Sequence, residues 1–146
     1  MNVPEYYERN LPHRLALGST LFLTFRLAGS LPLIARLKAE AAAPPDIPAD
    51  YAAQRRYFGR FDAFLDQATT GPTWLRVPAI AALVAEALHH RHGTGYELVA
   101  YCIMPNHVHA VVALPDDAPP LLRTLQSLKA NTAILANRHL QRTGPF

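Results

Sequence analysis

A strongly β-prone apolar segment from Leu98 to Pro115 carries two histidines one residue apart, His107 and His109. Because side chains alternate between the two faces of a strand, both imidazoles project from the same face. After the pair, no charged or polar residue follows until Asp116, so the two rings stand out on an apolar background. The opposite face, which we expect to enter a core, carries Val108, Ala110 and Val112.

The residues alone leave two interpretations of the histidine pair open. Histidines on strands are often exposed or satisfied by a single hydrogen bond, and such a pair has no ligand. Paired imidazoles at this spacing are alternatively ligands of one shared cation. A turn expected at Pro105-Asn106 places the pair near a strand end, where functional sites commonly lie. This position favours a metal site on His107 and His109.

Length and composition predict one domain over residues 1–146 and exclude several classes of protein. Half of the 146 residues are hydrophobic and 17% are charged, as in ordinary globular proteins. No apolar run approaches the roughly 18 residues of a membrane-spanning helix, and the first residues do not resemble a signal peptide. The single cysteine, Cys102, has no disulfide partner, and its apolar surroundings predict a small buried side chain. We therefore expect a cytoplasmic protein without a membrane partner.

Hydrophobic periodicity and helix-breaking residues divide the chain into strands and helices. Residues 1–18, punctuated by Pro and Arg, predict an arm before the first strand. We expect strands over residues 20–28, 96–103 and 106–114, and helices over 30–43, 51–68, 77–90 and 119–141. The expected buried face of the last helix consists of Leu121, Leu125, Leu128, Thr132 and Leu135. This order predicts an α+β fold, with an antiparallel sheet and helices packed on one face.

One long segment and several shorter ones form a recognisable order along the chain. The long segment is Tyr101-Cys-Ile-Met-Pro-Asn-His-Val-His109. The shorter ones are residues 9–13, 21–32, 61–66, 71–75 and 125–132, followed by Asn137 and Gly144-Pro-Phe146. Together they resemble the HUH single-strand DNA transposases, and most closely the REP-associated tyrosine transposases. The long segment matches the His-hydrophobic-His signature of that family, and the resemblance covers essentially the whole chain.

The resemblance implies a ferredoxin-like sheet and a protein that cleaves and rejoins single-stranded or hairpin DNA. In that family a divalent metal, Mg²⁺ or Mn²⁺, polarises the phosphate while a tyrosine forms a 5′-phosphotyrosine link. His107 and His109 match the two histidine ligands. The family's tyrosine and third metal ligand share a helix further downstream, whereas no tyrosine follows Tyr101 here. We therefore expect a chain truncated after Phe146, without the last strand, the tyrosine helix or any identified catalytic residue.

Basic and polar residues near the histidine strand are candidates for DNA contact. The net charge is +3, and Ala118 to Phe146 has four cationic side chains and no acidic one, which favours phosphate binding. Lys129 lies in this segment and is a candidate for DNA contact. The alternative interpretation is that these cationic side chains form a solvated helix face without a ligand. If the strand over residues 20–28 lies beside the histidine strand, Thr24 and Arg26 join the histidine surface. Arg26 then either binds phosphate through its planar fork or pairs with a carboxylate.

Three functions stay open at this point. The first is a transposase-like protein that binds metal and DNA but forms no covalent adduct, because it lacks the tyrosine. The second is a non-catalytic DNA-binding remnant or regulator, whose binding to hairpin DNA does not require the metal. The third is a protein unrelated to nucleic acid that holds a structural ion on the two histidines. A sheet edge left open by the missing strand also allows a homodimer.

Overall fold

The computed structural model describes residues 5–8, 12–15, 18–31, 59–60, 62–67 and 70–146. The described strands are β1 (Glu5–Glu8), β2 (Pro12–Leu15), β3 (Thr20–Arg26), β4 (Glu97–Ile103) and β5 (His107–Ala113). The named helical elements are the 3-10 helix η1 (Trp74–Arg76), α3 (Pro78–His90) and α4 (Leu121–His139). Residues 62–67 are also helical. Most of the helix expected over residues 30–43, and the start of that over 51–68, lie outside the described residues.

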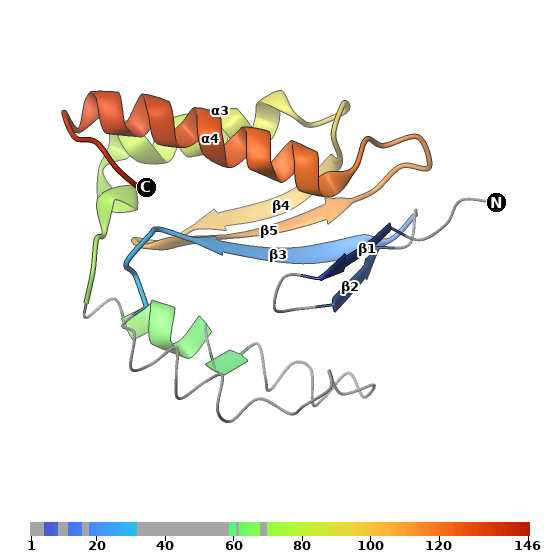
Figure 1. The fold of residues 1–146 in the computed structure, drawn as a ribbon, viewed down its shortest axis with the longest axis horizontal. Helices are drawn as coiled ribbons and strands as arrows, with labels where there is room; N and C mark the ends of the chain where they lie inside the picture. The colour runs from blue at the N-terminus through green and yellow to red at the C-terminus, as the bar shows by residue number, and fades with distance from the viewer. Residues whose placement is uncertain (1–4, 9–11, 16–17, 32–58, 61, 68–69) are drawn as a thin grey trace.

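The main sheet has three antiparallel strands in the order β3-β5-β4, so the histidine strand is central (Figure 1). The sequence prediction of an α+β fold with an antiparallel sheet is therefore confirmed. The expected arm over residues 1–18 instead contains a separate antiparallel pair, β1 and β2. The two adjacent tyrosines in β1 favour extended backbone. The sequence prediction missed this strand because it gave more weight to the Pro and Arg residues of the segment.

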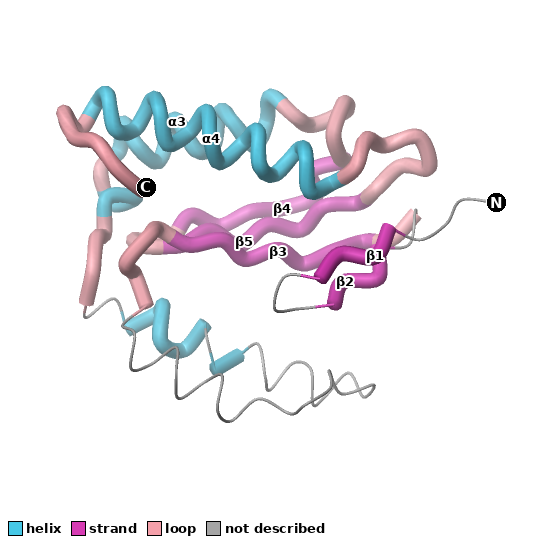
Figure 2. Tube along the Cα trace, in the orientation of Figure 1, coloured by secondary structure: helices cyan, strands magenta, loops and turns pink. Residues whose placement is uncertain are grey.

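Helices α3 and α4 cover one face of the sheet, and the helical residues 62–67 lie beyond the other face (Figures 1 and 2). The sequence placed helices on one face only. Strand β5 shows why the first face is covered, because Val108, Ala110 and Val112 are all buried there. The helix α3 begins at a proline, which suits the first helical turn because its missing N–H has no intrahelical acceptor there.

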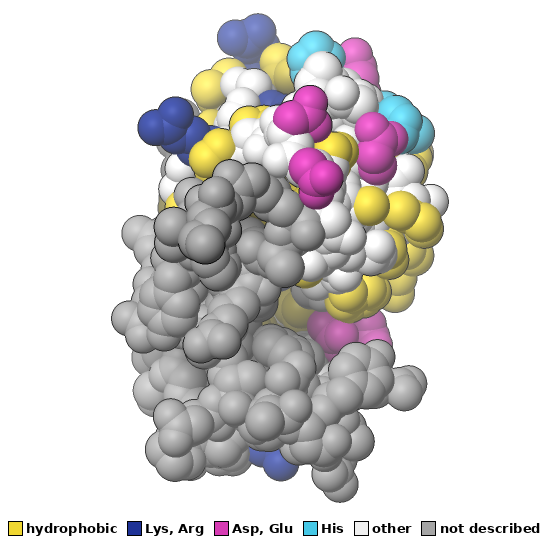
Figure 3. Space-filling view, turned by 90° about the vertical axis from the view of Figure 1, so that its right-hand side faces the viewer, with side chains coloured by type: hydrophobic (Ala, Val, Ile, Leu, Met, Phe, Trp, Pro, Cys, Tyr) yellow, Lys and Arg dark blue, Asp and Glu magenta, His cyan; other side chains and the backbone are white. Residues whose placement is uncertain are grey.

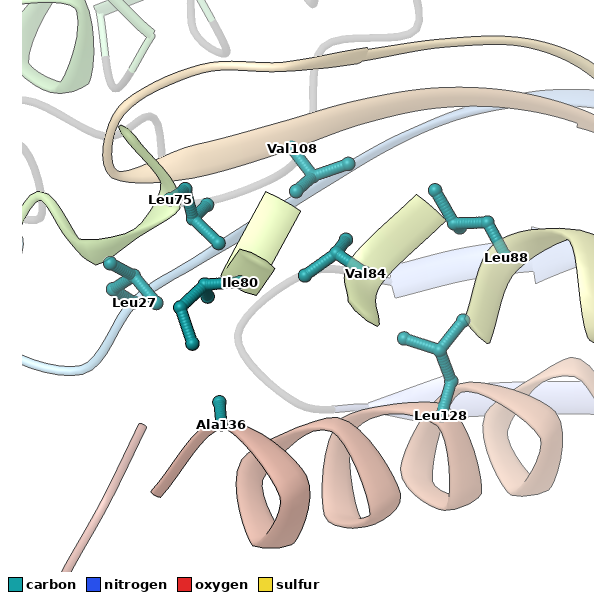
Figure 4. Packing of buried hydrophobic residues seen from close by; sticks show 8 residues of the cluster. All are labelled: Leu27, Leu75, Ile80, Val84, Leu88, Val108, Leu128 and Ala136. Carbon is teal, nitrogen blue, oxygen red and sulfur yellow. The ribbon is translucent and has the colours of Figure 1, made fainter. Parts of the chain in front are cut away.

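The core lies between the sheet and these two helices, with side chains converging from several elements (Figure 4). Its buried members are Leu27, Leu75, Ile80, Val84, Leu88, Val108, Leu128 and Ala136. Three of them recur every fourth residue along α3, which is the spacing of one helix face. Each fully buried aliphatic side chain contributes about 1.5–3 kcal/mol of hydrophobic stabilisation, so this cluster fixes the position of the helices on the sheet.

Two burial predictions are wrong. Leu135 of α4 is exposed, and the buried face of that helix instead includes Thr124 and Ala136. The face is rotated because small residues allow α4 to approach the sheet and α3 more closely than a leucine does. Cys102 is exposed rather than buried, since it lies on an edge strand and on the face that α3 and α4 do not cover.

Within the described residues, no helix is long and apolar enough to cross a membrane.

Candidate metal centre

The two histidines of β5 converge on one point. Their Nε2 atoms lie 3.0 Å apart, and the ring centroids are separated by 4.6 Å with the planes nearly perpendicular. His107 is fully buried and His109 is half-buried. Because Val108 enters the core between them, both rings project from the sheet face opposite α3 and α4. The shared face expected from the sequence is therefore confirmed.

Asn106 determines which nitrogen of His107 carries the proton. The Asn106 side chain is fully buried, and its amide NH₂ donates to the carbonyl of Leu65 at 2.9 Å. Its Oδ1 then faces Nδ1 of His107 at 2.7 Å, and a carbonyl oxygen can only accept. Nδ1 of the neutral ring must therefore be protonated, which leaves the Nε2 lone pair directed toward His109. A partner of this kind is what orients metal-binding histidines in proteins.

Thr24 supports the second histidine. On β3, Thr24 pairs directly opposite His109, and its hydroxyl lies 2.9 Å from Nδ1 of that ring. A hydroxyl both donates and accepts, so it suits either neutral tautomer of His109. With Nε2–H donating to His107, the hydroxyl donates to Nδ1. With the proton on Nδ1, the hydroxyl accepts it, and Nε2 of His109 also offers a lone pair to a cation.

A third donor, Asp66, joins the pair from outside the sheet. Its Oδ1 lies 3.5 Å from Nε2 of His107, and one ligand atom from each of Asp66, His107 and His109 lies within 4.8 Å of the others. The side chain of Asp66 is 55% exposed, so the group opens to solvent on the carboxylate side. The hydrogen bond between Asn106 and the Leu65 carbonyl anchors the helical residues 62–67 that carry this carboxylate.

Sequence reasoning missed Asp66 as a ligand. The segment over residues 61–66 was noted as part of the resemblance, but no spacing rule connects it with residues 107 and 109. The only signal in the sequence was a carboxylate within a predicted helix, and this does not point to the histidines. Contact between these segments is decided only when the chain is folded.

Burial is the main cause that lowers the pKa of His107 below its ordinary value of 6.5, and His109 lowers it further. The carboxylates of Asp66 and Asp62 oppose this shift. The ring is therefore neutral at neutral pH, which is the form that binds a metal. Two imidazole nitrogens and one carboxylate oxygen suit Mn²⁺, Fe²⁺ or Zn²⁺ better than Mg²⁺, which prefers oxygen ligands. The donor set thus fits a divalent metal, and fits Mn²⁺ better than Mg²⁺.

The surface around the three donors is partly aromatic. Phe22, on β3, is 64% exposed, and its ring stacks on His109 with centroids 5.2 Å apart. Cys102 pairs opposite His109 on the other neighbouring strand and is exposed as well. The DNA contacts predicted on this face from the sequence were Thr24 and Arg26, and no aromatic side chain was among them. The sequence does place Phe22 on this face, because side chains alternate along β3 and Phe22 is two residues from Thr24.

The three residues expected to contact DNA lie on two sides of the sheet. Thr24 pairs with His109 and Arg26 with His107, so β3 does lie beside the histidine strand. Nη1 of Arg26 lies 3.4 Å from the Leu27 carbonyl and 3.5 Å from the Ser30 hydroxyl, at the end of β3. Lys129 is on α4, and its ammonium lies over the ring of Phe25, on the helix-covered face. Lys129 is thus separated from the histidine face.

The structure describes the side chains of two tyrosines, Tyr96 and Tyr101, and neither reaches His107 or His109. Tyr101 pairs opposite Ala110, on the helix-covered face, and its hydroxyl lies 3.3 Å from Nε2 of His89. Tyr96 is buried and donates to the carbonyl of Leu88. Tyr101, the last tyrosine of the sequence, therefore points away from the candidate metal centre.

The far end of the sheet has a different character. Figure 3 shows acidic side chains gathered with histidines at the end of the molecule where β4 begins and β5 ends. The exposed residues at this end include His92, Glu97, Asp116 and Asp117. Nδ1 of His92 accepts the Leu98 N–H at 2.9 Å and lies 3.5 Å from a Glu97 oxygen, so its polar contacts are local. The negative charge lies at the opposite end of β5 from His107.

No protein-family model, curated protein or solved structure matches this chain in the comparisons made with each. The structural basis for a function is therefore the geometry of Asp66, His107 and His109 and the surface around them.

Proposed function

We propose that this chain is a transposase-like protein of the HUH class that binds single-stranded or hairpin DNA with the help of a divalent metal. The observation that carries the proposal is the convergence of the His107 and His109 Nε2 atoms beside the Asp66 carboxylate, at a site that opens to solvent on the carboxylate side. Family resemblance supplies the DNA substrate, and the donor set supplies the metal.

Each residue around the centre has a role in this proposal. His107, His109 and Asp66 hold the cation, which when bound supplies positive charge to a DNA phosphate. Asn106 and Thr24 orient the two rings through their Nδ1 atoms. Phe22 offers an exposed ring on which a base stacks, and Arg26 at the end of β3 contributes positive charge. Because the described tyrosines lie elsewhere, we expect binding without a covalent link.

The test is binding of fluorescent oligonucleotides, single-stranded or hairpin, to the full chain in Mn²⁺, in Mg²⁺ and in a chelator. We expect tighter binding in Mn²⁺ than in chelator, and His107→Ala should remove this difference. The matched control is His92→Ala, a histidine whose contacts are local and far from the centre. A denaturing gel should show no covalent protein–DNA species. If oligonucleotides bind in no condition, the proposal is wrong.

Two other outcomes correspond to the competing functions. Hairpin binding that persists in chelator and in His107→Ala indicates a DNA-binding remnant or regulator that does not use the metal. Tight Zn²⁺ binding without any DNA binding, with a large loss of stability on chelation, indicates a structural ion. One observation favours the latter, because Asp66 comes from outside the sheet and an ion on the three donors would hold that segment in place.

A further inference from the structure

A small cavity lies on the other side of β3, between that strand and α4, away from the three donors. Its volume is about 100 Å³. Most of its wall is apolar, and five wall residues belong to the core cluster of Figure 4, namely Leu27, Leu75, Val84, Val108 and Leu128. Phe25 and Phe146 complete the apolar part. This space is enough for a small organic molecule, because about 10–15 Å³ measured in the same way already holds one water.

One side of the cavity is polar and positively charged. Lys129, Arg26 and Thr132 contribute to its lining. Within the described part of the chain no carboxylate pairs with Lys129, and its ammonium lies 5.8 Å from the centre of the Phe25 ring. Partial burial lowers the pKa of Lys129, and the nearby charge of Arg26 lowers it further. Both effects are relieved by an anion beside the ammonium.

Thr132 gives an independent indication of a ligand. The residue is only 5% exposed, and its Oγ1 has no hydrogen-bond partner among the described residues. A buried hydroxyl without a partner costs about 1–3 kcal/mol, so such groups are uncommon in native proteins. Threonines inside helices usually bond the carbonyl four residues earlier, and this one does not. The hydroxyl is thus available to donate to a molecule in the cavity.

The geometry points to a binding site for a small organic acid, with its carboxylate between Lys129 and the Thr132 hydroxyl and a short aliphatic tail in the apolar part. Inorganic phosphate fits less well, because a strongly hydrated dianion gains nothing from leucine, valine and phenylalanine walls. A neutral apolar molecule leaves the ammonium and the hydroxyl without a partner. The cavity lies on the opposite face of the sheet from His107 and His109, and Arg26, at the end of β3, is shared by the two proposed sites.

The test is a titration of the full chain with butyrate, followed by nuclear magnetic resonance in the presence of a chelator. We expect saturable shifts at the amides of α4 around Lys129 and Thr132. The neutral isostere butyramide should cause much smaller shifts. Lys129→Met should weaken butyrate binding about tenfold, the loss of one hydrogen bond to a charged group. The matched control is Arg123→Gln, a cation on the same helix that does not line the cavity, which should bind as the wild type.

A second variant keeps the test decisive if Lys129→Met folds poorly. Thr132→Val removes the hydroxyl at nearly constant shape, so it should bind butyrate a few-fold more weakly while melting no lower than the wild type. Equal binding of butyrate and butyramide overturns the inference, as does equal binding of phosphate. Shifts that map away from α4, unchanged binding in both variants, or no binding at all overturn it as well.

Discussion

The Nε2 atoms of His107 and His109 lie 3.0 Å apart at the beginning of the central strand, with a carboxylate oxygen of Asp66 3.5 Å from the first. Two nitrogen lone pairs cannot face each other at this distance without repulsion. Either a proton or a cation must lie between them. Since the Nδ1 proton of His107 is fixed by Asn106, the proton in the metal-free pair belongs to His109. The pair therefore binds a proton or a metal in the same place.

The Asp66 carboxylate should strengthen metal binding in the absence of DNA. Asp66→Asn keeps the shape of the side chain and removes its charge, so we expect Mn²⁺ affinity to fall by about 10- to 100-fold, a range typical of losses at metal sites. Calorimetric titration with Mn²⁺ measures this change. Asp62→Asn is the control, because Asp62 also acts electrostatically on His107 but is outside the three-donor group. Equal losses in the two variants would show that charge alone, not ligation, is responsible.

Removing the Asn106 side chain should destabilise the fold. Asn106→Ala leaves the Leu65 carbonyl and Nδ1 of His107 without their buried partner, at a cost of about 2–4 kcal/mol in the free energy of unfolding. Urea denaturation at pH 7 with a chelator present gives this value without any contribution from bound metal. Asn137→Ala removes a bond to the Gly144 carbonyl and a bond accepted from the Arg142 guanidinium, and it should cost less, about 1 kcal/mol, because these groups can bond to water instead. A similar small loss in Asn106→Ala contradicts the bridging role.

The exposed ring of Phe22 should contribute to binding of single strands. Phe22→Ala should weaken oligonucleotide binding by about 1–3 kcal/mol, the usual contribution of one base stacked on an aromatic ring. Its unfolding free energy should change by less than about 0.5 kcal/mol, because the side chain is on the surface. Anisotropy titrations of a single-stranded oligonucleotide provide the measurement. Ile134→Ala, at an exposed apolar position of α4, should bind as the wild type. Unchanged binding in Phe22→Ala removes the stacking surface from the proposal.

Tyr96 should make the fold sensitive to alkaline pH. Burial raises the pKa of its hydroxyl above the ordinary 10.0, and the charge of Arg91 offsets this in part. The unfolded chain therefore loses this proton first, so the stability that Tyr96 provides is complete below pH 10 and is lost as pH rises through the folded-state pKa. Urea denaturation between pH 8 and pH 11 should show a steeper decline in wild type than in Tyr96→Phe. Parallel declines would assign the effect to other groups.

Strand and helix placement could largely be predicted from local pattern. The strands expected over residues 96–103 and 106–114 agree closely with β4 and β5, and the helix expected over residues 77–90 agrees closely with α3. The face of α4 was harder, because small residues such as Ala136 and Thr124 pack inward while the larger Leu135 remains exposed. Burial there depends on how closely two helices approach, which no single-helix pattern contains.

The candidate site divides in the same way. The sequence by itself determined that His107 and His109 share a face, because alternation along a strand is a property of the extended backbone. Only the tertiary structure decided that Asp66 lies beside them. The buried side-chain amide of Asn106 donates to the carbonyl of Leu65, about forty residues away, and this bond joins β5 to the segment that carries Asp66. The tertiary structure also separated Lys129 from that face and turned Tyr101 toward α3, through an irregularity in pairing between Leu98 and Ala100. Local periodicity fixes direction along one element, whereas contacts between distant segments depend on the packing of the whole domain.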